Sequence, residues 1–215
     1  MTRDTTLTPA LLVQAARVTV VTLLLTGLAY PLIVTGLSQL LFSSRANGSL
    51  VEDAKGRVVG SELVGQGFTT PGYLWPRPSA AGEKGWDASA SSGSNLGPTS
   101  AKLRARVQAD VERLQKENPA APGPVPAELV TTSGSGLDPH LSPASARWQA
   151  PRIAAARGLA PERVLAVIDE ATEGRDLGFL GEPRVNVLLV NLAIDRRFGA
   201  SPRAAPPGAS GAEGR

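Results

Sequence analysis

Residues 18–42 read VTVVTLLLTGLAYPLIVTGLSQLLF, a run without a charged side chain. A helix rises about 1.5 Å per residue and the hydrocarbon core of a bilayer is about 30 Å thick, so roughly 20 apolar residues span it. A cleavable signal sequence has a shorter apolar stretch that ends in a small-x-small site, and no such site directly follows Leu41. We therefore expect a retained membrane helix, with a kink at Pro31.

One face of this predicted helix carries hydroxyl groups. Thr22, Thr26 and Tyr30 recur every fourth residue, and Gly27 and Gly36 allow another backbone to approach closely. Such faces often contact a second membrane helix. Threonine hydroxyls also bond back to carbonyl groups of their own helix, so the sequence leaves both interpretations open.

Charge and cysteine content exclude several classes of function. The chain has 22 Lys and Arg against 19 Asp and Glu, dispersed among one another, and its few aromatic residues do not interleave with a basic stripe. Nucleic-acid binding is therefore not expected. Arginines and lysines lie on both sides of the apolar run, so the positive-inside rule does not choose an orientation. Without cysteine, thiolate metal sites and cysteine nucleophiles are excluded.

The composition predicts four segments. A flank at 1–17 precedes the membrane helix, residues 43–198 have the size of one compact domain, and residues 199–215 are mostly Pro, Gly, Ala and Ser with little to bury. We expect this last segment to be a disordered tail. The glycine-rich stretch at 79–99 is long for a loop inside a domain, which is typical of a loop that covers a surface or contacts a partner.

The domain itself has the pattern of an α+β fold. Apolar residues at 103, 107, 111 and 114 repeat with helical spacing after the start signal Pro98–Thr99. A second helix is predicted to begin with Ser142 as N-cap, to be interrupted at Pro151 and to end at Gly158. Pro161 opens a third.

Strands are less clearly marked. Short apolar pairs at 58–59, 63–64 and 129–130 lie among glycines and prolines and predict short strands. The run at 185–194 fits a buried helix or a core strand about equally by its period. The helix is favoured because charged residues follow at 195–197 without a turn signal.

The single histidine limits the possible catalytic sites. A Ser-His-Asp arrangement would have to use His140, and no histidine cluster exists to hold zinc. Asp138 lies two residues away and serines lie at 133, 135 and 142, which allows the hypothesis of a hydrolase. The alternative is that the Gly and Ser residues form a turn and that Asp138 caps the approach to the next helix.

A second pair of polar residues follows this turn. The SGSG at 133–136 is not a Walker loop, because no Lys-Ser/Thr pair follows it. Gln149 and Arg152 lie three residues apart on the predicted helix, where the glutamine could bond a ribose or base edge and the arginine a phosphate. The other interpretation is a solvated helix face.

Four motifs give the chain a family resemblance. They follow the anchor in this order: RPSA at 77–80, GSNLGP at 93–98, SGSGLDPHLSPASARWQAPRIAAAR at 133–157 and GEPRVNVLLVNLAID at 181–195. Together they resemble the C chain of the bacterial potassium-transporting Kdp ATPase, the KdpC family. The resemblance covers nearly the whole chain from the anchor to about Arg197.

The resemblance implies an accessory subunit of a high-affinity potassium uptake pump in the bacterial inner membrane. Its partners would be a channel-like potassium-binding subunit and a P-type ATPase that hydrolyses ATP through an aspartyl phosphate. Its role would be assembly, stabilisation and regulation, with no catalytic residue, metal site or intrinsic cofactor of its own. The alternative is a membrane-anchored hydrolase using Asp138 and His140.

The resemblance also assigns a role to Gln149 and Arg152. The family is described as a catalytic chaperone that raises the ATP affinity of the catalytic subunit, with the glutamine of a Gln-x-x-Arg motif contacting the nucleotide. ATP would then be shared with that subunit. The family's soluble domain is also placed outside the cytoplasmic membrane, where ATP is scarce. There it would cover the mouth of the potassium pathway through the loop at 79–99 and the turn at 134–140.

Overall fold

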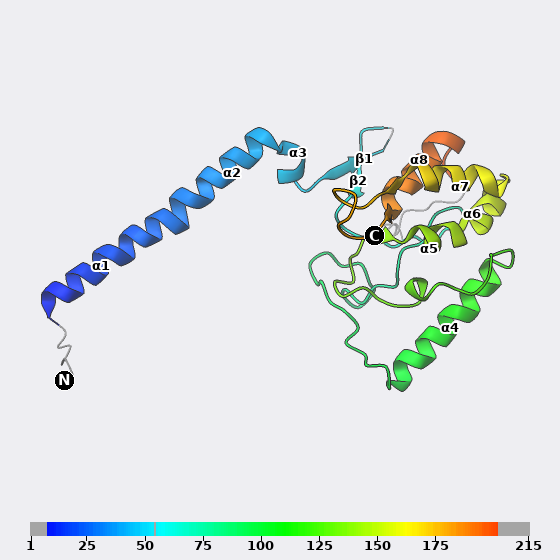
Figure 1. Cartoon of the computed structure of the whole chain (residues 1–215), viewed down its shortest axis with the longest axis horizontal. Coiled ribbons are helices and arrows are strands. Elements are labelled where there is room, and N and C mark those ends of the chain that lie inside the picture. The colour runs from blue at the N-terminus through cyan, green and yellow to red at the C-terminus, as the bar shows by residue number, and fades with distance from the viewer. Residues whose placement is uncertain (1–7, 54, 202–215) are drawn as a thin grey trace, which may run out of the picture. The chain divides into compact units, whose positions relative to one another are not determined.

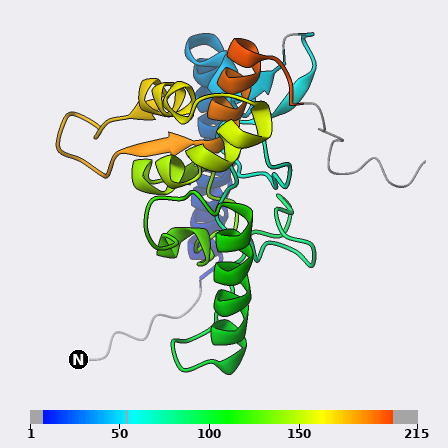
Figure 2. The same ribbon diagram turned by 90° about the vertical axis from the view of Figure 1, so that its right-hand side faces the viewer.

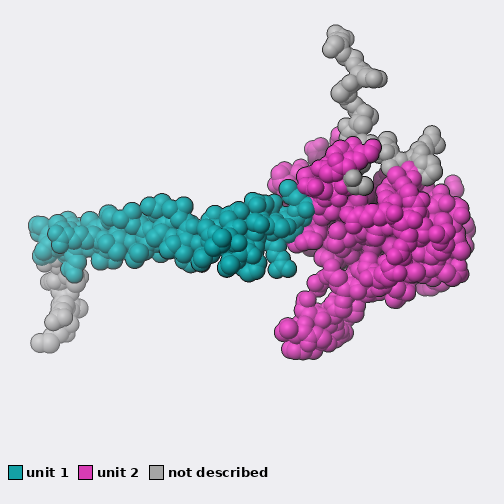
Figure 3. Space-filling view, turned by 90° about the horizontal axis from the view of Figure 1, so that it is seen from above, with its two compact units in different colours: residues 1–50 teal, residues 51–215 magenta. Residues whose placement is uncertain are grey.

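The computed structural model describes residues 8–53 and 55–201. The chain divides into two compact units, residues 1–50 and 51–215 (Figures 1 and 3). Unit 1 contains an apolar helix, and unit 2 mixes helices with short strands. This architecture confirms the predicted α+β class with one N-terminal apolar helix. From residue 202 on, the predicted disordered tail lies outside the described residues.

The apolar helix of unit 1 runs from Pro9 to Leu41. It consists of α1 (Pro9–Leu23), a π-helical stretch η1 (Leu24–Ala29) and α2 (Tyr30–Leu41). Its 33 residues, with a mean hydropathy of 2.0 over an 18-residue window, suit a membrane span by length and composition. The helix begins earlier than residue 18 because Thr8 caps it, accepting a hydrogen bond from the Leu11 backbone, and Pro9 suits the first helical position.

The helix widens just before Pro31. Proline has no backbone N–H, and its ring crowds the carbonyl group four residues earlier, so the preceding turn must change. Here it becomes the π-helical stretch η1, in which the Tyr30 N–H reaches the carbonyl of Leu25. The expected distortion at Pro31 thus takes the form of a π-turn. The Thr26 hydroxyl donates to the Thr22 carbonyl at 2.8 Å, as the back-bonding interpretation predicts.

A hairpin of two short strands follows the helix. After α3 (Ser43–Ala46), β1 (Leu50–Glu52) pairs with β2 (Val58–Ser61), which confirms the strand predicted at 58–59. The strand predicted at 63–64 is wrong, because the Leu63 N–H donates to the Ser61 hydroxyl and the chain turns there.

The remaining elements of unit 2 bear out the predicted helices. In chain order they are α4 (Ala101–Glu117), the 3-10 helix η2 (Ala127–Leu129), β3 (His140–Leu141), α5 (Pro143–Trp148), α6 (Ala150–Arg157), α7 (Pro161–Glu170), β4 (Thr172–Glu173), β5 (Arg184–Asn186) and α8 (Val187–Phe198). Ser142 caps α5 by accepting from the Ser145 N–H, and Gly158 ends α6 with a φ of 65°. The predicted interruption falls between α5 and α6, at Gln149.

The three-stranded sheet has the order β3-β5-β4, and both pairings are antiparallel. Val185 is opposite Leu141 on one side and Thr172 on the other. The run at 185–194 is therefore a strand for two residues and a helix from residue 187. The change occurs at Asn186, whose side chain accepts from the Leu189 N–H and caps α8.

The strand predicted at 129–130 is wrong. Leu129 lies in η2, and the N–H groups of Leu129 and Val130 bond back to carbonyl groups three residues earlier. Pro126 precedes this turn with its φ fixed at −59°, a value that suits a 3-10 turn. Both side chains are still buried in the core, so the apolar pair marks burial rather than a strand.

The core of unit 2 lies between the sheet and helices α5 to α8, which Figure 1 shows grouped together. Its fully buried apolar side chains include Leu74, Leu141, Ile153, Val164, Ile168, Val185, Val190 and Ile194. Leu74 comes from an extended segment without regular secondary structure, so side chains must satisfy the backbone polar groups there.

Candidate functional site

Gln149 holds the backbone of Trp75. Its side chain is fully buried at the junction of α5 and α6. Its Oε1 accepts from the Trp75 N–H at 2.9 Å, and its Nε2 donates to the Trp75 carbonyl at 3.0 Å. The amide thus pairs with Trp75 through one acceptor and one donor, as a neighbouring strand would.

Asn191 pairs in the same way with the backbone of Leu74, the residue before Trp75. The Leu74 N–H donates to Asn191 Oδ1 at 2.7 Å, and Asn191 Nδ2 donates to the Leu74 carbonyl at 3.0 Å. Asn191 lies on α8, whose neighbouring residues face the core, and its side chain is buried. Two amide side chains on different elements therefore take the place of a partner strand.

Arg152 binds the same segment from α6. Its Nη1 donates to the Pro71 carbonyl, and its Nη2 donates to the Tyr73 carbonyl at 3.0 Å and to Gln149 Oε1 at 2.7 Å. The guanidinium lies 3.6 Å from the centroid of the Trp75 ring, a cation–π contact. Burial lowers the pKa of Arg152 to about 9, and the charge of Glu117 opposes this shift. The guanidinium therefore stays charged at neutral pH.

Arg157 completes the arrangement. Its Nε donates to the Gly72 carbonyl at 2.7 Å, and its Nη2 pairs with Asp195 Oδ1 at 2.7 Å. The other Asp195 oxygen accepts from the Tyr73 hydroxyl at 2.8 Å. Burial, and then the hydrogen bond to Asp195, raise the pKa of Tyr73.

We call Gln149, Arg152, Arg157 and Asn191 the side-chain clamp. Together they bind the carbonyl groups of all five residues from 71 to 75. The clamp offers hydrogen bonds to a backbone and no nucleophile or proton-transferring pair, so its chemistry is that of positioning. It fixes residues 71–75 within the long irregular segment that runs from β2 to α4.

Gln149 and Arg152 are both buried. Neither lies on a solvated helix face, so that interpretation is wrong. Contact with a nucleotide stays a prediction. In this conformation the Gln149 amide is occupied by Trp75 and Arg152, and a nucleotide would have to displace the Trp75 backbone to reach it.

Asp138 and His140 lie together but without a serine nucleophile aligned. The Asp138 carboxylate accepts from the His140 N–H at 2.9 Å and lies 3.6 Å from its Nδ1. The nearby hydroxyls bond elsewhere: Ser133 accepts from the Gly136 N–H, and Ser142 donates to Glu128 at 2.8 Å. This arrangement agrees with the predicted turn and gives the hydrolase hypothesis no support.

Asp138 gives the domain an expected dependence on pH. A hydrogen bond from the His140 side chain, with further help from the charge of Arg77, lowers the pKa of Asp138 below its ordinary 3.8 although burial opposes this. The ionised carboxylate therefore stabilises the fold above that pH, and this contribution is lost as the pH falls. The urea concentration at which wild type unfolds should therefore decrease between about pH 5 and about pH 2. We expect this decrease to be smaller in Asp138→Asn, which has no carboxylate to protonate at position 138. The same decrease in the variant and in wild type would contradict the expectation.

The SGSG turn packs against the predicted long loop. The Ser79 hydroxyl donates to the Gly136 carbonyl at 2.6 Å, and the Ser92 N–H donates to the Ser135 carbonyl at 2.9 Å. Gly136 has a φ of 69°, and a Cβ there would lie 2.5 Å from the Ser92 carbonyl oxygen. The glycine therefore serves a close contact between two loops, not a phosphate cradle.

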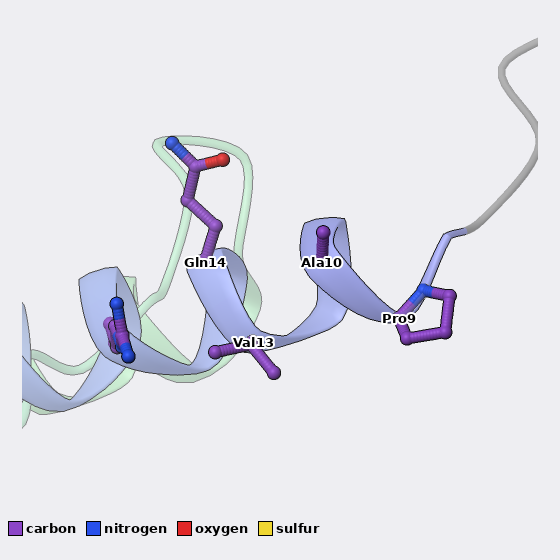
Figure 4. A pocket seen from close by; sticks show the side chains of 5 residues that line it. Pro9, Ala10, Val13 and Gln14 are labelled. Carbon is purple, nitrogen blue, oxygen red and sulfur yellow. The ribbon is translucent and has the colours of Figure 1, made fainter.

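Among the described residues we find no cluster of side chains suited to a metal ion, that is, no group of three or more His, Cys, Asp or Glu placed to hold one. A shallow hollow lies along the first turns of α1, lined by Pro9, Ala10, Val13, Gln14 and Arg17 (Figure 4). One exposed helix lines it alone, so it is a helix surface rather than a binding cavity.

Comparison with known proteins identifies the family. The family model described as KdpC, the c chain of the K⁺-transporting ATPase, matches residues 12–196. This chain belongs to the KdpC family. A potassium-transporting ATPase KdpC subunit from Myxococcus xanthus is 70% identical over 192 residues, which cover 89% of this chain and 90% of that protein. Its counterpart from Rhodospirillum rubrum is 55% identical over 193 residues, 90% of this chain and 96% of that protein.

Membership of the KdpC family confirms the predicted resemblance. It makes the chain a subunit of a potassium-transporting ATPase, associated with the membrane through one apolar helix. The sequence prediction did not assign Asn191 and Arg157 to the site. Asn191 had a detectable signal, because a polar residue inside an apolar run at 185–194 must find a buried partner. Arg157 had none, since an arginine in the last turn of a helix is common.

Proposed function

We propose that this chain is a non-catalytic accessory subunit that assembles and stabilises a potassium pump. Its partners are a channel-like potassium-binding subunit and a P-type ATPase that carries out ATP hydrolysis. The observation that carries the proposal is a 33-residue apolar helix with no side chain buried against the rest of this chain. In the domain that follows it, Gln149 and Asn191 use their buried amide groups to bind the domain's own backbone. Such a helix needs lipid or other membrane helices around it.

The exposed helix supports the pairing with a membrane subunit. Gly27 and Gly36 have no atom within 4 Å of where a Cβ would lie, so a second backbone can approach closely there. We place the soluble domain on the extracytoplasmic side, where the paired loops at 79–99 and 134–140 would cover the mouth of the potassium pathway. The contacts of Gln149 support an extracytoplasmic domain, because this residue bonds the Trp75 backbone and needs no cytoplasmic ATP to do so.

We propose in addition a catalytic-chaperone role, in which this chain raises the ATP affinity of the catalytic subunit. Since Gln149 bonds Trp75 and Arg152, we expect substitutions of Gln149 to change ATP dependence through the stability of this domain. A Gln149→Ala complex that loses ATP affinity while unit 2 keeps wild-type stability would favour direct nucleotide contact instead.

Co-purification tests the proposal. We expect a chain tagged after Arg215 and extracted from its host membranes in mild detergent to bring down a channel-like subunit and a P-type ATPase. His140→Ala should leave the yield of this complex unchanged, because the His140 side chain contacts Asp138 of its own turn in the contacts described above, and the substitution leaves the backbone pairing of β3 with β5 in place. Recovery of the chain alone while the pump is expressed would contradict the proposal, and loss of a hydrolytic activity in His140→Ala would revive the anchored hydrolase.

A further inference from the structure

The connection between β4 and β5 ends in an apolar tip. Leu177, Phe179 and Leu180 are 83%, 68% and 49% exposed. Leu177 and Phe179 are the most exposed large hydrophobic side chains that the structure describes in unit 2. In Figure 2 this yellow-to-orange segment extends away from the helices of the unit. The tip therefore presents apolar surface that no other described part of the chain covers.

The backbone of the tip is well defined by its own hydrogen bonds. Asp176 and Leu180 exchange both N–H to carbonyl bonds at 2.9 Å, and the Gly178 N–H donates to the Arg175 carbonyl at 3.1 Å. Leu177 has a φ of 53°, in the left-handed region where glycine and asparagine are favoured. A leucine that is both strained and exposed gains no packing from the described part of this chain, which favours a contact with another molecule.

The charges around the tip disfavour a lipid surface as that contact. Arg175 pairs with Glu182 at 2.8 Å, and Arg184 pairs with Glu173 at 2.9 Å and with Asp176 at 3.3 Å. Two arginines therefore face three carboxylates, and no excess positive charge remains for anionic headgroups. Segments that bind membrane surfaces carry an excess of Lys and Arg. Neutralised charge around an apolar tip suits an apolar pocket in a protein.

The apolar area of the tip indicates which kind of protein binds it. Three side chains of this kind present roughly 400 Å² of apolar surface, about half of what each partner of a stable interface buries. Two copies meeting tip to tip would therefore bury too little area to hold a dimer. A contact of this size is sufficient when another attachment already holds the partners together, because the second contact is then intramolecular. The membrane helix provides such an attachment.

We propose that Leu177, Phe179 and Leu180 dock into an apolar pocket on another subunit of the potassium-transporting ATPase. This inference rests on the proposed function as a pump subunit. The hairpin provides a second contact that fixes the soluble domain after the membrane helix has paired.

A double variant, Leu177→Asn with Phe179→Ser, tests the docking. Asparagine suits the positive φ at 177, so the domain should keep its urea midpoint. We expect about tenfold less of the partner subunits to co-purify with the tagged full chain. The matched control is Leu63→Asn, which removes another exposed leucine of unit 2 and should leave recovery unchanged. Wild-type recovery with the double variant would overturn the proposal.

A photo-crosslinking amino acid at position 177 of the full chain, in host membranes, identifies the occupant. An adduct with another subunit of the ATPase supports docking. Adducts only with lipid, adducts only with a second copy of this chain, or no adduct at all would overturn it. The failure of the proposed function is distinguishable, because the wild-type chain would then recover no pump subunits before any hairpin residue is changed.

Discussion

Gln149→Ala is expected to lower the free energy of unfolding of unit 2 by about 3 kcal/mol. The change leaves the Trp75 N–H and carbonyl buried without partners, since both bond to the Gln149 amide. Each buried polar group left unpaired costs about 1–3 kcal/mol, and the truncated side chain leaves a small cavity. The measurement is urea unfolding of the full chain in detergent and without nucleotide, with tryptophan fluorescence as the signal.

Gln108→Ala is the matched control for this substitution. Gln108 is exposed on α4, where its amide donates to Glu112 at 3.1 Å. Its removal should change the free energy of unfolding by less than about 0.5 kcal/mol. If Gln149→Ala unfolded at the same urea concentration as Gln108→Ala, the glutamine would not hold Trp75 in solution.

Arg152→Lys is expected to destabilise unit 2 by about 2–3 kcal/mol although it keeps the positive charge. The planar guanidinium reaches the Pro71 and Tyr73 carbonyls and Gln149 while it stacks on the Trp75 ring. A lysine ammonium is a compact point charge that cannot keep this geometry and is costly to bury. The expected result is a lower urea midpoint together with a change in tryptophan fluorescence.

The control for this prediction is Arg147→Lys. Arg147 is half exposed and pairs with Asp169 at 2.8 Å on the surface. Exposed ion pairs contribute about 0–1 kcal/mol, so the control should remain close to wild type. If the two lysine variants were equally stable, the positive charge at position 152 would be sufficient, and the planar hydrogen-bonding geometry of the guanidinium would not contribute to stability.

Local signals predicted most of the helices. Ser142 followed by Pro143 marks a helix start in any context, and Gly158 marks an end because only its left-handed backbone closes the helix. The apolar helix was equally predictable, since length and hydropathy suffice. The uncharged run begins only after Arg17, but the helix begins at Pro9, because one arginine near a helix end can reach toward the membrane surface.

The short strands and the clamp were harder to predict for a physical reason. Strands of two or three residues carry too few positions for a period of two to be recognised. The clamp joins Trp75 to Gln149 across 74 residues and Leu74 to Asn191 across 117. Side chains that bond a distant backbone leave no periodic signal. Spacing alone could place Gln149 and Arg152 on one helix, but it could not show that another segment covers them.

Amide hydrogen exchange at Leu74 and Trp75 in the full chain, without nucleotide, tests the clamp most directly. These two N–H groups are the ones that donate to the side chains of Asn191 and Gln149. We predict strong protection of both in wild type and exchange at Trp75 that is faster by about a hundredfold in Gln149→Ala, with no effect of added ATP on either protein. Unprotected exchange of Trp75 in the wild-type chain, or protection that develops only when ATP is added, would contradict the account.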